Sequence, residues 1–497
     1  MQLKRAVTDS RFGSNDKKKT KIDSDDEIPS DTDESELSDV SGEEPEDEFD
    51  GETPHEKHVR LTKKALAEAL KTVGSDEEDA RAALSVRLQE EALQARGKLF
   101  SKIAHTYKPV SLADAVCLRG HRKSINCVCI SSDCSFLYSG GKDASIFKWS
   151  LIDFRKICSA HGGPKGSNSK YHTGPILSMD ISDDGKYLAS GSSDKSILVW
   201  NPDDLLVLFR LQRHFAPVTA LSFRRQSHMM FSGDRSGRVC VWNMPLTEIL
   251  QDQGYVLSYL FVNIMCLPKT LRAATKVEVL SICGLSAERC VSSSGFGGAG
   301  ICLWKVEEEV CVQYSVKNIS EHSVECVYAV NDDLFIGGST SNTLYLWHVS
   351  RGSPISKIYP AHPPVTRDMD SPTSRPALNW VTAVSGLFGT DLFASGSSTG
   401  HVRLWRLVVE GKAFTFGDED EEPRSKGRLK VHHDTTKIEP IPNGEFHLAG
   451  YVNSLAFSND GQWLAAGIGQ EHRLGRWEDR RKVNDVVCLL PINISFK

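Results

Sequence analysis

The sequence predicts an all-β protein in which seven small sheets close into a ring, a seven-bladed β-propeller. Nine tryptophans occur in the 497 residues, and seven of them end a run of alternating apolar residues. Each run follows a strand of small residues, which itself follows another apolar strand. These seven tryptophans are Trp149, Trp200, Trp242, Trp304, Trp347, Trp405 and Trp477. The shortest intervals between them, 42 and 43 residues, match the period of four-stranded propeller repeats.

The first repeat shows the strand order that the others follow. INCVCI (125–130) is the first strand, FLYSGG (136–141) the second, and IFKW, ending at Trp149, the third. AVCLRG (115–120) and VVCLLP (486–491) compete for the outer place that closes the ring. The propeller is expected over 108–492, with blades near 121–160, 172–211, 214–250, 276–316, 322–360, 380–416 and 450–492 and insertions at 245–275, 363–379 and 417–447.

A histidine precedes the first strand of several repeats, and an aspartate lies in the turn before the tryptophan strand of the first three. This pattern resembles the WD repeat, and the resemblance implies a structural hydrogen-bond network within each blade rather than a catalytic group. Its expected members are His121, Asp143, Trp149, His172, Asp194, Trp200, His214, Asp234 and Trp242. Later repeats carry glycine near 297–298, Ser341 or Asn342, and Thr399 instead of aspartate, so we expect a weaker polar network there.

The N-terminal part differs in composition from the propeller. Residues 1–56 hold 19 acidic and seven basic residues, a net charge of −12, which leaves +6 on the remainder. Residues 1–55 are therefore predicted to be a disordered tail, and the KKKTK cluster at 17–21 resembles a nuclear-import signal. Apolar residues at helical spacing predict a short helical segment over 56–107.

Several classes of protein are disfavoured by composition. The 13 cysteines include no C-x-x-C pair, and the N-terminus lacks an apolar signal segment, which favours a reducing nuclear or cytosolic compartment. The longest apolar run, at 255–268, is too short to span a membrane. No Ser-His-Asp order, phosphate-binding loop or zinc-ligand spacing occurs, so we expect no enzymatic activity, metal or cofactor.

A group of basic residues is predicted at one mouth of the propeller. They lie before the first strand of a blade or in the turn before its tryptophan strand: Arg122, Lys123, Lys142, Lys195, Arg213 and Arg235. Lysine and arginine at such a rim suit RNA phosphates. The alternative is an ordinary solvated surface, because the net charge of the body is modest.

The last repeat resembles one family closely. GIGQEHRLGRW at 467–477 is similar to the final blade of the U3 small nucleolar ribonucleoprotein 55-kilodalton family, also called ribosomal RNA-processing protein 9. EKHVRLTKKALAEAL (56–70) and LRGHRKSINCV (118–128) support the resemblance. It implies a nuclear, nucleolar protein that binds box B/C of U3 RNA together with a kink-turn-binding box C/D protein. It further implies a role with other small-subunit processome proteins in 18S rRNA maturation.

The same segment supplies the remaining candidate RNA contacts. Arg473 and Arg476, with His472 and Gln470, stand where the repeat itself requires only the tryptophan. Ion pairs to Glu471 or Asp479 are the alternative explanation for the two arginines. A protein-only WD-repeat adaptor, such as a substrate receptor or chromatin scaffold, remains the alternative function.

Overall fold

The chain divides into two compact units, Met1–Gly74 and Ser75–Lys497. The computed structural model describes residues 100–164, 170–244, 271–272, 277–285, 289–295, 300–306, 308, 310–314, 323–363, 379–409, 436–475 and 483–494, all within the second unit. The predicted tail, the helical segment up to residue 99 and most of the three insertions lie outside these residues. Two short 3-10 helices, η1 (Ala104–Thr106) and η2 (Leu112–Asp114), precede the sheets.

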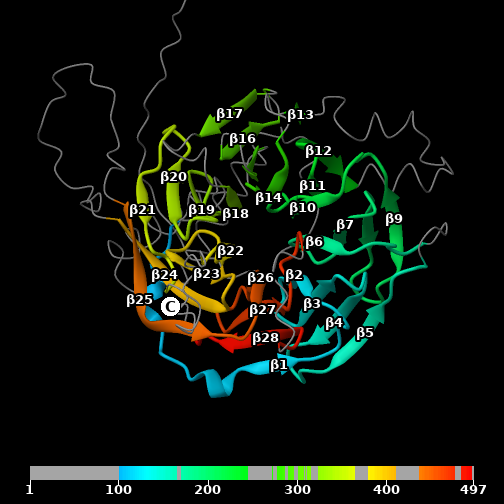
Figure 1. Cartoon of the computed structure of the whole chain (residues 1–497), viewed down its shortest axis with the longest axis horizontal. Coiled ribbons are helices and arrows are strands. Elements are labelled where there is room, and N and C mark those ends of the chain that lie inside the picture. Colours follow the sequence, from blue (N-terminus) through cyan, green and yellow to red (C-terminus); the bar gives the residue numbers. More distant parts are fainter. Residues whose placement is uncertain are drawn as a thin grey trace, which may run out of the picture. The chain divides into compact units, whose positions relative to one another are not determined.

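Seven four-stranded antiparallel sheets fan around a common axis, which confirms the predicted fold class (Figure 1). The first sheet contains β2 (Ile125–Ile130), β3 (Phe136–Gly141), β4 (Ile146–Ser150) and β5 (Lys156–Ala160). The second contains β6 (Ile176–Ile181), β7 (Leu188–Ser192), β8 (Ile197–Trp200) and β9 (Val207–Leu211). The third contains β10 (Val218–Phe223), β11 (Met229–Asp234), β12 (Arg238–Asn243) and β13 (Leu271–Arg272).

The remaining sheets follow in chain order. The fourth contains β14 (Val279–Gly284), β15 (Arg289–Ser294), β16 (Ile301–Lys305) and β17 (Val310–Tyr314). The fifth contains β18 (Val324–Ala329), β19 (Leu334–Ser339), β20 (Leu344–His348) and β21 (Ser356–Ile358). The sixth contains β22 (Val381–Gly386), β23 (Leu392–Ser397), β24 (His401–Val409) and β25 (Thr436–His447). The seventh contains β26 (Tyr451–Phe457), β27 (Trp463–Gly469), β28 (Val486–Pro491) and β1 (Val116–Leu118).

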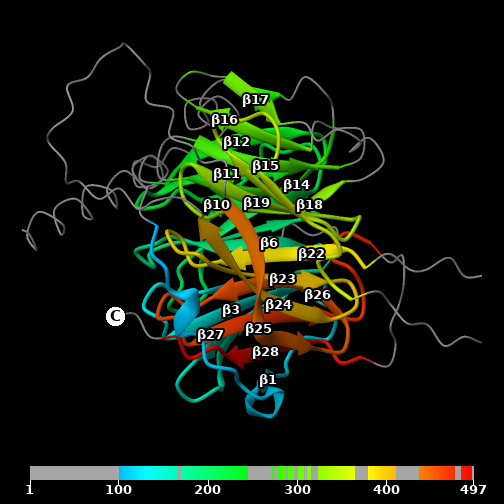
Figure 2. The same ribbon diagram turned by 90° about the vertical axis from the view of Figure 1, so that its left-hand side faces the viewer.

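The first strand of each sheet lies at the axis, and neighbouring sheets pack face to face, as Figure 2 shows from the side. Residues on both faces of the second and third strands are therefore buried, for example throughout β7 and β8. Side chains of the inner strands also bond to the backbone of the next sheet. The Asn126 amide donates to the Ile176 carbonyl at 2.6 Å, and the Asn453 amide donates to the Ile125 carbonyl at 2.8 Å. The second of these bonds joins the seventh sheet to the first.

The closing sheet corrects one expectation. RLGRW, ending at Trp477, was expected to be its third strand, but β28 pairs with β27 in that position and β1 pairs with β28 outside it. The two competing segments therefore both belong to the sheet. Leu490 faces Leu464, where the second sheet has Trp200 facing Leu188. Every residue of β28 is buried, and its continuous apolar sequence suits that place better than a segment with two arginines.

Hydrogen-bond networks join histidine, aspartate, serine and tryptophan in the first three sheets. In the second sheet, His172 Nδ1 lies 3.1 Å from the Asp194 carboxylate, and His172 Nε2 lies 2.8 Å from Ser190 Oγ. Trp200 Nε1 donates to the same Ser190 oxygen at 2.7 Å. The repeat pattern indicated the histidine, aspartate and tryptophan of this network but not the serine, although the serine has a fixed place in the small-residue strand.

The first and third sheets repeat this geometry with His121, Asp143, Ser139 and Trp149, and with His214, Asp234, Ser232 and Trp242. Burial acts to raise the pKa of the three aspartates, but hydrogen bonds from the histidine and from nearby hydroxyl or backbone groups, together with the charge of the histidine, outweigh burial and hold each pKa below its usual range. The carboxylates therefore stay ionised within the fold, and the networks tie the turn before the third strand to the segment before the first.

The later sheets keep parts of the network. In the sixth sheet, Trp405 Nε1 donates to Ser395 Oγ at 2.8 Å, and His362 Nε2 lies 2.9 Å from that oxygen. In the fifth sheet, Gly337 replaces the serine. Among the described residues, Trp347 Nε1 has no hydrogen-bond partner. Apolar packing around the buried indole therefore stabilises this blade without the polar contact.

Candidate nucleic-acid interface

The loop that follows β27 crosses the mouth of the channel where the inner strands begin, which we call the first mouth. Backbone groups hold this loop in place: Gln470 N donates to Asp485 Oδ1 at 2.9 Å, and Arg473 N donates to Asn453 Oδ1 at 3.0 Å. The Gln470 side chain donates to the Val483 carbonyl at 2.7 Å. Because β28 takes the third place in the sheet, residues 470–475 are free to leave its plane and enter the channel.

Arg473 reaches from the seventh sheet across the channel to three others. Its guanidinium donates to the carbonyls of Leu280 at 2.6 Å, Thr219 at 3.3 Å and Glu325 at 3.3 Å. Burial lowers the pKa of Arg473, against the opposing effect of the nearby Glu325 carboxylate. The side chain thus bridges β10, β14 and β18 at the axis, a role that its position in the sequence did not indicate.

His472 points into the protein rather than into the cavity. It is 1% exposed and makes edge-to-face ring contacts with Trp380 and Tyr451, with centroid distances of 6.0 and 6.2 Å. Burial, reinforced by the charges of Arg473 and Lys142, lowers its pKa to about 3. A neutral, buried imidazole offers no charge to a phosphate. His472 and Gln470 support the loop in this structure, and their contact with RNA remains a prediction.

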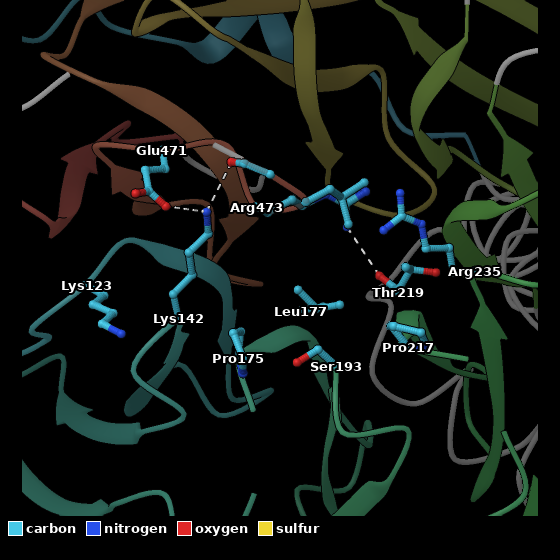
Figure 3. Close-up of a pocket in the computed structure, with 12 residues that line it drawn as sticks. Lys123, Lys142, Pro175, Leu177, Ser193, Pro217, Thr219, Arg235, Glu471 and Arg473 are labelled. Carbon is cyan, nitrogen blue, oxygen red and sulfur yellow. Dashed lines mark hydrogen bonds and ion pairs between the residues drawn. The ribbon is translucent and has the colours of Figure 1, made fainter. Parts of the chain in front are cut away.

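A cavity of about 260 Å³ opens beside this loop, as Figure 3 shows. Four of the predicted basic residues line it: Lys123, Lys142, Arg235 and Arg473. They come from the first, third and seventh sheets, so only the closed ring brings them together. Further lining residues are Pro175, Leu177, Ser193, Pro217, Thr219, Glu471, Leu474 and Gly475. The cavity therefore combines apolar walls with a basic rim.

Two of the basic residues at this cavity have acidic partners. Lys142 Nζ donates to Glu471 Oε2 at 2.8 Å and to the Gly475 carbonyl at 3.3 Å, which fixes the loop against the first sheet (Figure 3). Arg235 Nε donates to Glu278 Oε2 at 3.0 Å, yet the Arg235 side chain is 60% exposed. Lys123 is exposed at the rim. Arg235 and Lys123 therefore present positive charge to solvent, whereas the Lys142 ammonium is bonded to residues of the loop.

The remaining predicted cations lie around the same mouth or outside the described residues. Arg122 is exposed beside Lys123, and Lys195 is exposed in the turn between β7 and β8. Arg213 is half-buried before β10. Arg476 lies outside the described residues. For the described part of the chain, no group of three or more His, Cys, Asp or Glu residues is placed to hold a metal ion. No helix in that part is long and apolar enough to cross a membrane.

The family model and the related proteins that match this chain agree with each other. The model of the WD domain, G-beta repeat, matches residues 115–150, 167–201, 206–243 and 440–477. U3 small nucleolar RNA-interacting protein 2 of Homo sapiens is 32% identical over 450 residues, covering 89% of this chain and 82% of that protein. The U3 snoRNP-associated protein-like EMB2271 of Arabidopsis thaliana is 30% identical over 501 residues, covering 96% and 93%.

Solved structures agree with the sequence relatives. Those described as "Structure of U3-55K" and "Crystal structure of RRP9 WD40 repeats" are both 29% identical to this chain, with TM-scores of 0.62 and 0.63. Each covers 78% of this chain and 100% of the solved chain. With the closed ring of seven sheets and the extent of these matches, the chain belongs to the U3-55K/Rrp9 family of WD-repeat proteins.

Proposed function

We propose that this protein is a non-enzymatic component of the U3 small nucleolar ribonucleoprotein that acts in pre-rRNA processing. Relatives named for interaction with U3 small nucleolar RNA or for association with the U3 snoRNP cover most of the chain. The structural observation that carries the proposal is the cavity at the first mouth, where basic residues from three sheets surround apolar walls. Exposed lysine and arginine at such a mouth suit RNA phosphates, and the apolar walls suit an unstacked base.

The finer proposal concerns the RNA and its partners. The chain binds the box B/C region of U3 RNA together with a kink-turn-binding box C/D protein, and it joins other processome proteins in the maturation of 18S rRNA. It acts in the nucleus, in the nucleolus. The rigid ring supplies a platform for this assembly, because Arg473 and the networks of the first three sheets fix the rim residues relative to one another.

A salt-dependent binding measurement tests the proposal. The purified chain and the kink-turn protein are mixed with box B/C RNA, and the affinity is measured over a salt series. Replacing both Lys123 and Arg235 by Gln is expected to weaken binding several-fold and to reduce the slope of log K against log salt by about 1 to 2. The control variant is Lys357→Gln. Lys357 is an exposed lysine on β21, the outer strand of the fifth sheet, so its replacement should change neither the affinity nor the salt slope.

A second measurement separates RNA binding from a protein-only adaptor. The tagged chain is recovered from cells with and without ribonuclease, and box C/D RNA is measured in both samples. The proposal expects U3 RNA in the untreated sample and loss of RNA-dependent partners after digestion. Recovery of protein partners alone, with no box C/D RNA, would contradict it.

A further inference from the structure

The opposite end of the channel, which we call the second mouth, holds a cavity of about 290 Å³. Its walls are the final residues of the seven inner strands and the turns that follow them. The cavity lies away from the basic loop of the first mouth. Its polar side chains take no part in the proposed RNA interface.

Tyr328 lines this cavity, and its buried hydroxyl is unsatisfied. The residue lies on the inner strand β18 and is 8% exposed. In the described part of the chain, its hydroxyl has no hydrogen-bond partner. Burial raises the pKa of this hydroxyl above its usual range, so the group is a protonated hydrogen-bond donor. A buried donor without an acceptor is costly, and a bound group that accepts its hydrogen bond would remove that cost.

Arg225 brings a positive charge to the same cavity. Its guanidinium lies against the Phe388 ring, 4.7 Å from the centroid, and Nη1 is 3.9 Å from Asp183 Oδ1. Within the residues that the structure describes, the guanidinium makes no hydrogen bond, and a third of the side chain is exposed. The ring contact holds the planar group in place while its N–H groups stay available for a ligand.

Two aspartates near Arg225 limit what can bind. Asp180 accepts bonds from the backbone N–H groups of Ile181 at 3.0 Å and Phe223 at 2.7 Å. Asp183 accepts one from the Gln226 N–H at 2.6 Å. These hydrogen bonds satisfy oxygen atoms of the two carboxylates, but the negative charge of the carboxylates still repels an extended polyanion. One added negative group can pair with the single arginine, whereas a run of RNA phosphates would meet both aspartates.

We propose that the second mouth binds one acidic side chain of a protein segment, with its carboxylate held by the Arg225 guanidinium and the Tyr328 hydroxyl. A planar carboxylate matches the paired N–H groups of arginine and accepts a further bond from a hydroxyl. The volume lies at the lower end of the range for small-ligand pockets, which suits a single side chain. This end of the ring would thus dock a protein, while the first mouth faces RNA.

The test uses the full chain and N-acetyl-glutamate methylamide as the smallest probe, with N-acetyl-glutamine methylamide as its neutral counterpart. Binding is measured by ligand-observed nuclear magnetic resonance. The glutamate probe is expected to bind and the glutamine probe to bind at least about tenfold more weakly, because charge-assisted bonds are the stronger ones. Equal binding of the two probes, or binding of neither, overturns the proposal.

Variants assign the binding to this cavity. Arg225→Gln is expected to lose at least about tenfold in affinity, and Tyr328→Phe about two- to tenfold. Tyr328→Phe should not lower the melting temperature, because it removes an unpartnered hydroxyl and keeps the ring. Lys195→Gln, at the first mouth, should leave probe binding unchanged. Unchanged binding in Tyr328→Phe, or displacement of the probe by a 12-nucleotide single-stranded RNA, would overturn the proposal.

Discussion

The second and sixth sheets share one architecture but stabilise it with different chemistry. Both place a histidine next to the serine that accepts the tryptophan N–H. In the second sheet Asp194 accepts from His172, whereas the sixth sheet has Thr399 in the corresponding turn. Among the described residues, His362 Nδ1 has no partner. The same blade geometry can therefore be maintained with a histidine–aspartate hydrogen bond or with a neutral imidazole that lacks it.

The largest difference in stability between the two sheets should appear when Asp194, or the threonine in the corresponding turn, is replaced. Asp194→Ala leaves His172 without its buried partner and also removes acceptors for Thr173 and Ser196. Because a hydrogen bond to a charged group contributes about 1.5–3 kcal/mol, losing these bonds is expected to lower the free energy of unfolding by about 3 kcal/mol or more. Thr399→Ala removes one hydroxyl contact with Ser397 and should cost about 1 kcal/mol or less. Denaturant unfolding of both variants measures the difference, and equal losses would show that the aspartate has no special role.

Acid should affect the two sheets in different pH ranges. Burial, with the charges of Arg403 and His401, lowers the pKa of His362 to about 3, against about 6.5 in an unfolded chain. The unfolded chain therefore binds a proton at this histidine first, and the contribution of His362 to stability falls by about 1.4 kcal/mol per pH unit as pH drops from 6.5 toward 3. The pKa of Asp194 is instead lowered, so its contribution is present above pH 3.9 or so and is lost only below it.

A single variant isolates the histidine of the sixth sheet. His362→Gln should reduce the slope of stability against pH between 6.5 and 5 by up to about 1.4 kcal/mol per pH unit, whereas the contribution of His472, which carries a similar shift, remains. Unfolding in denaturant at several pH values measures this slope for the variant and the original chain. An unchanged slope would mean that His362 does not resist protonation in the folded state.

The smallest effect concerns the indole contact. Trp405→Phe loses the bond to Ser395, whereas Trp347→Phe removes an N–H that has no partner in the described structure. Both variants lose ring volume from the core, so their difference reports the hydrogen bond. Trp405→Phe is expected to be more destabilising by about 1 kcal/mol. If the two melting temperatures fell equally, the indole bond would contribute nothing measurable.

The sequence was informative about features that each blade contains within itself. Alternation of apolar residues identified the three strands around Trp200, and the same order in each repeat predicted the closed ring. The aspartate and histidine of the first three blades were also recognisable, because their spacing repeats along the chain. The serine between them escaped notice, since small residues are common in such strands.

The sequence was less informative about contacts between distant segments. It placed Lys123 and Arg235 at one mouth but did not reveal that Arg473 crosses the channel to three inner strands. Tyr328 and Arg225 also came together without a motif to mark them. Each of these groupings depends on which strand occupies which place in the ring.

Local periodicity thus determined from sequence alone that this protein is a ring of repeated sheets, because side-chain alternation is a property of each strand by itself. Tertiary structure decided the rest: β1 and β28, more than 360 residues apart, meet in the closing sheet, and the pairing of β28 with β27 leaves residues 470–475 free to enter the channel. The physical reason is that pairing depends on competition among many apolar segments for one edge. The spacing of residues within a segment does not record the outcome of that competition.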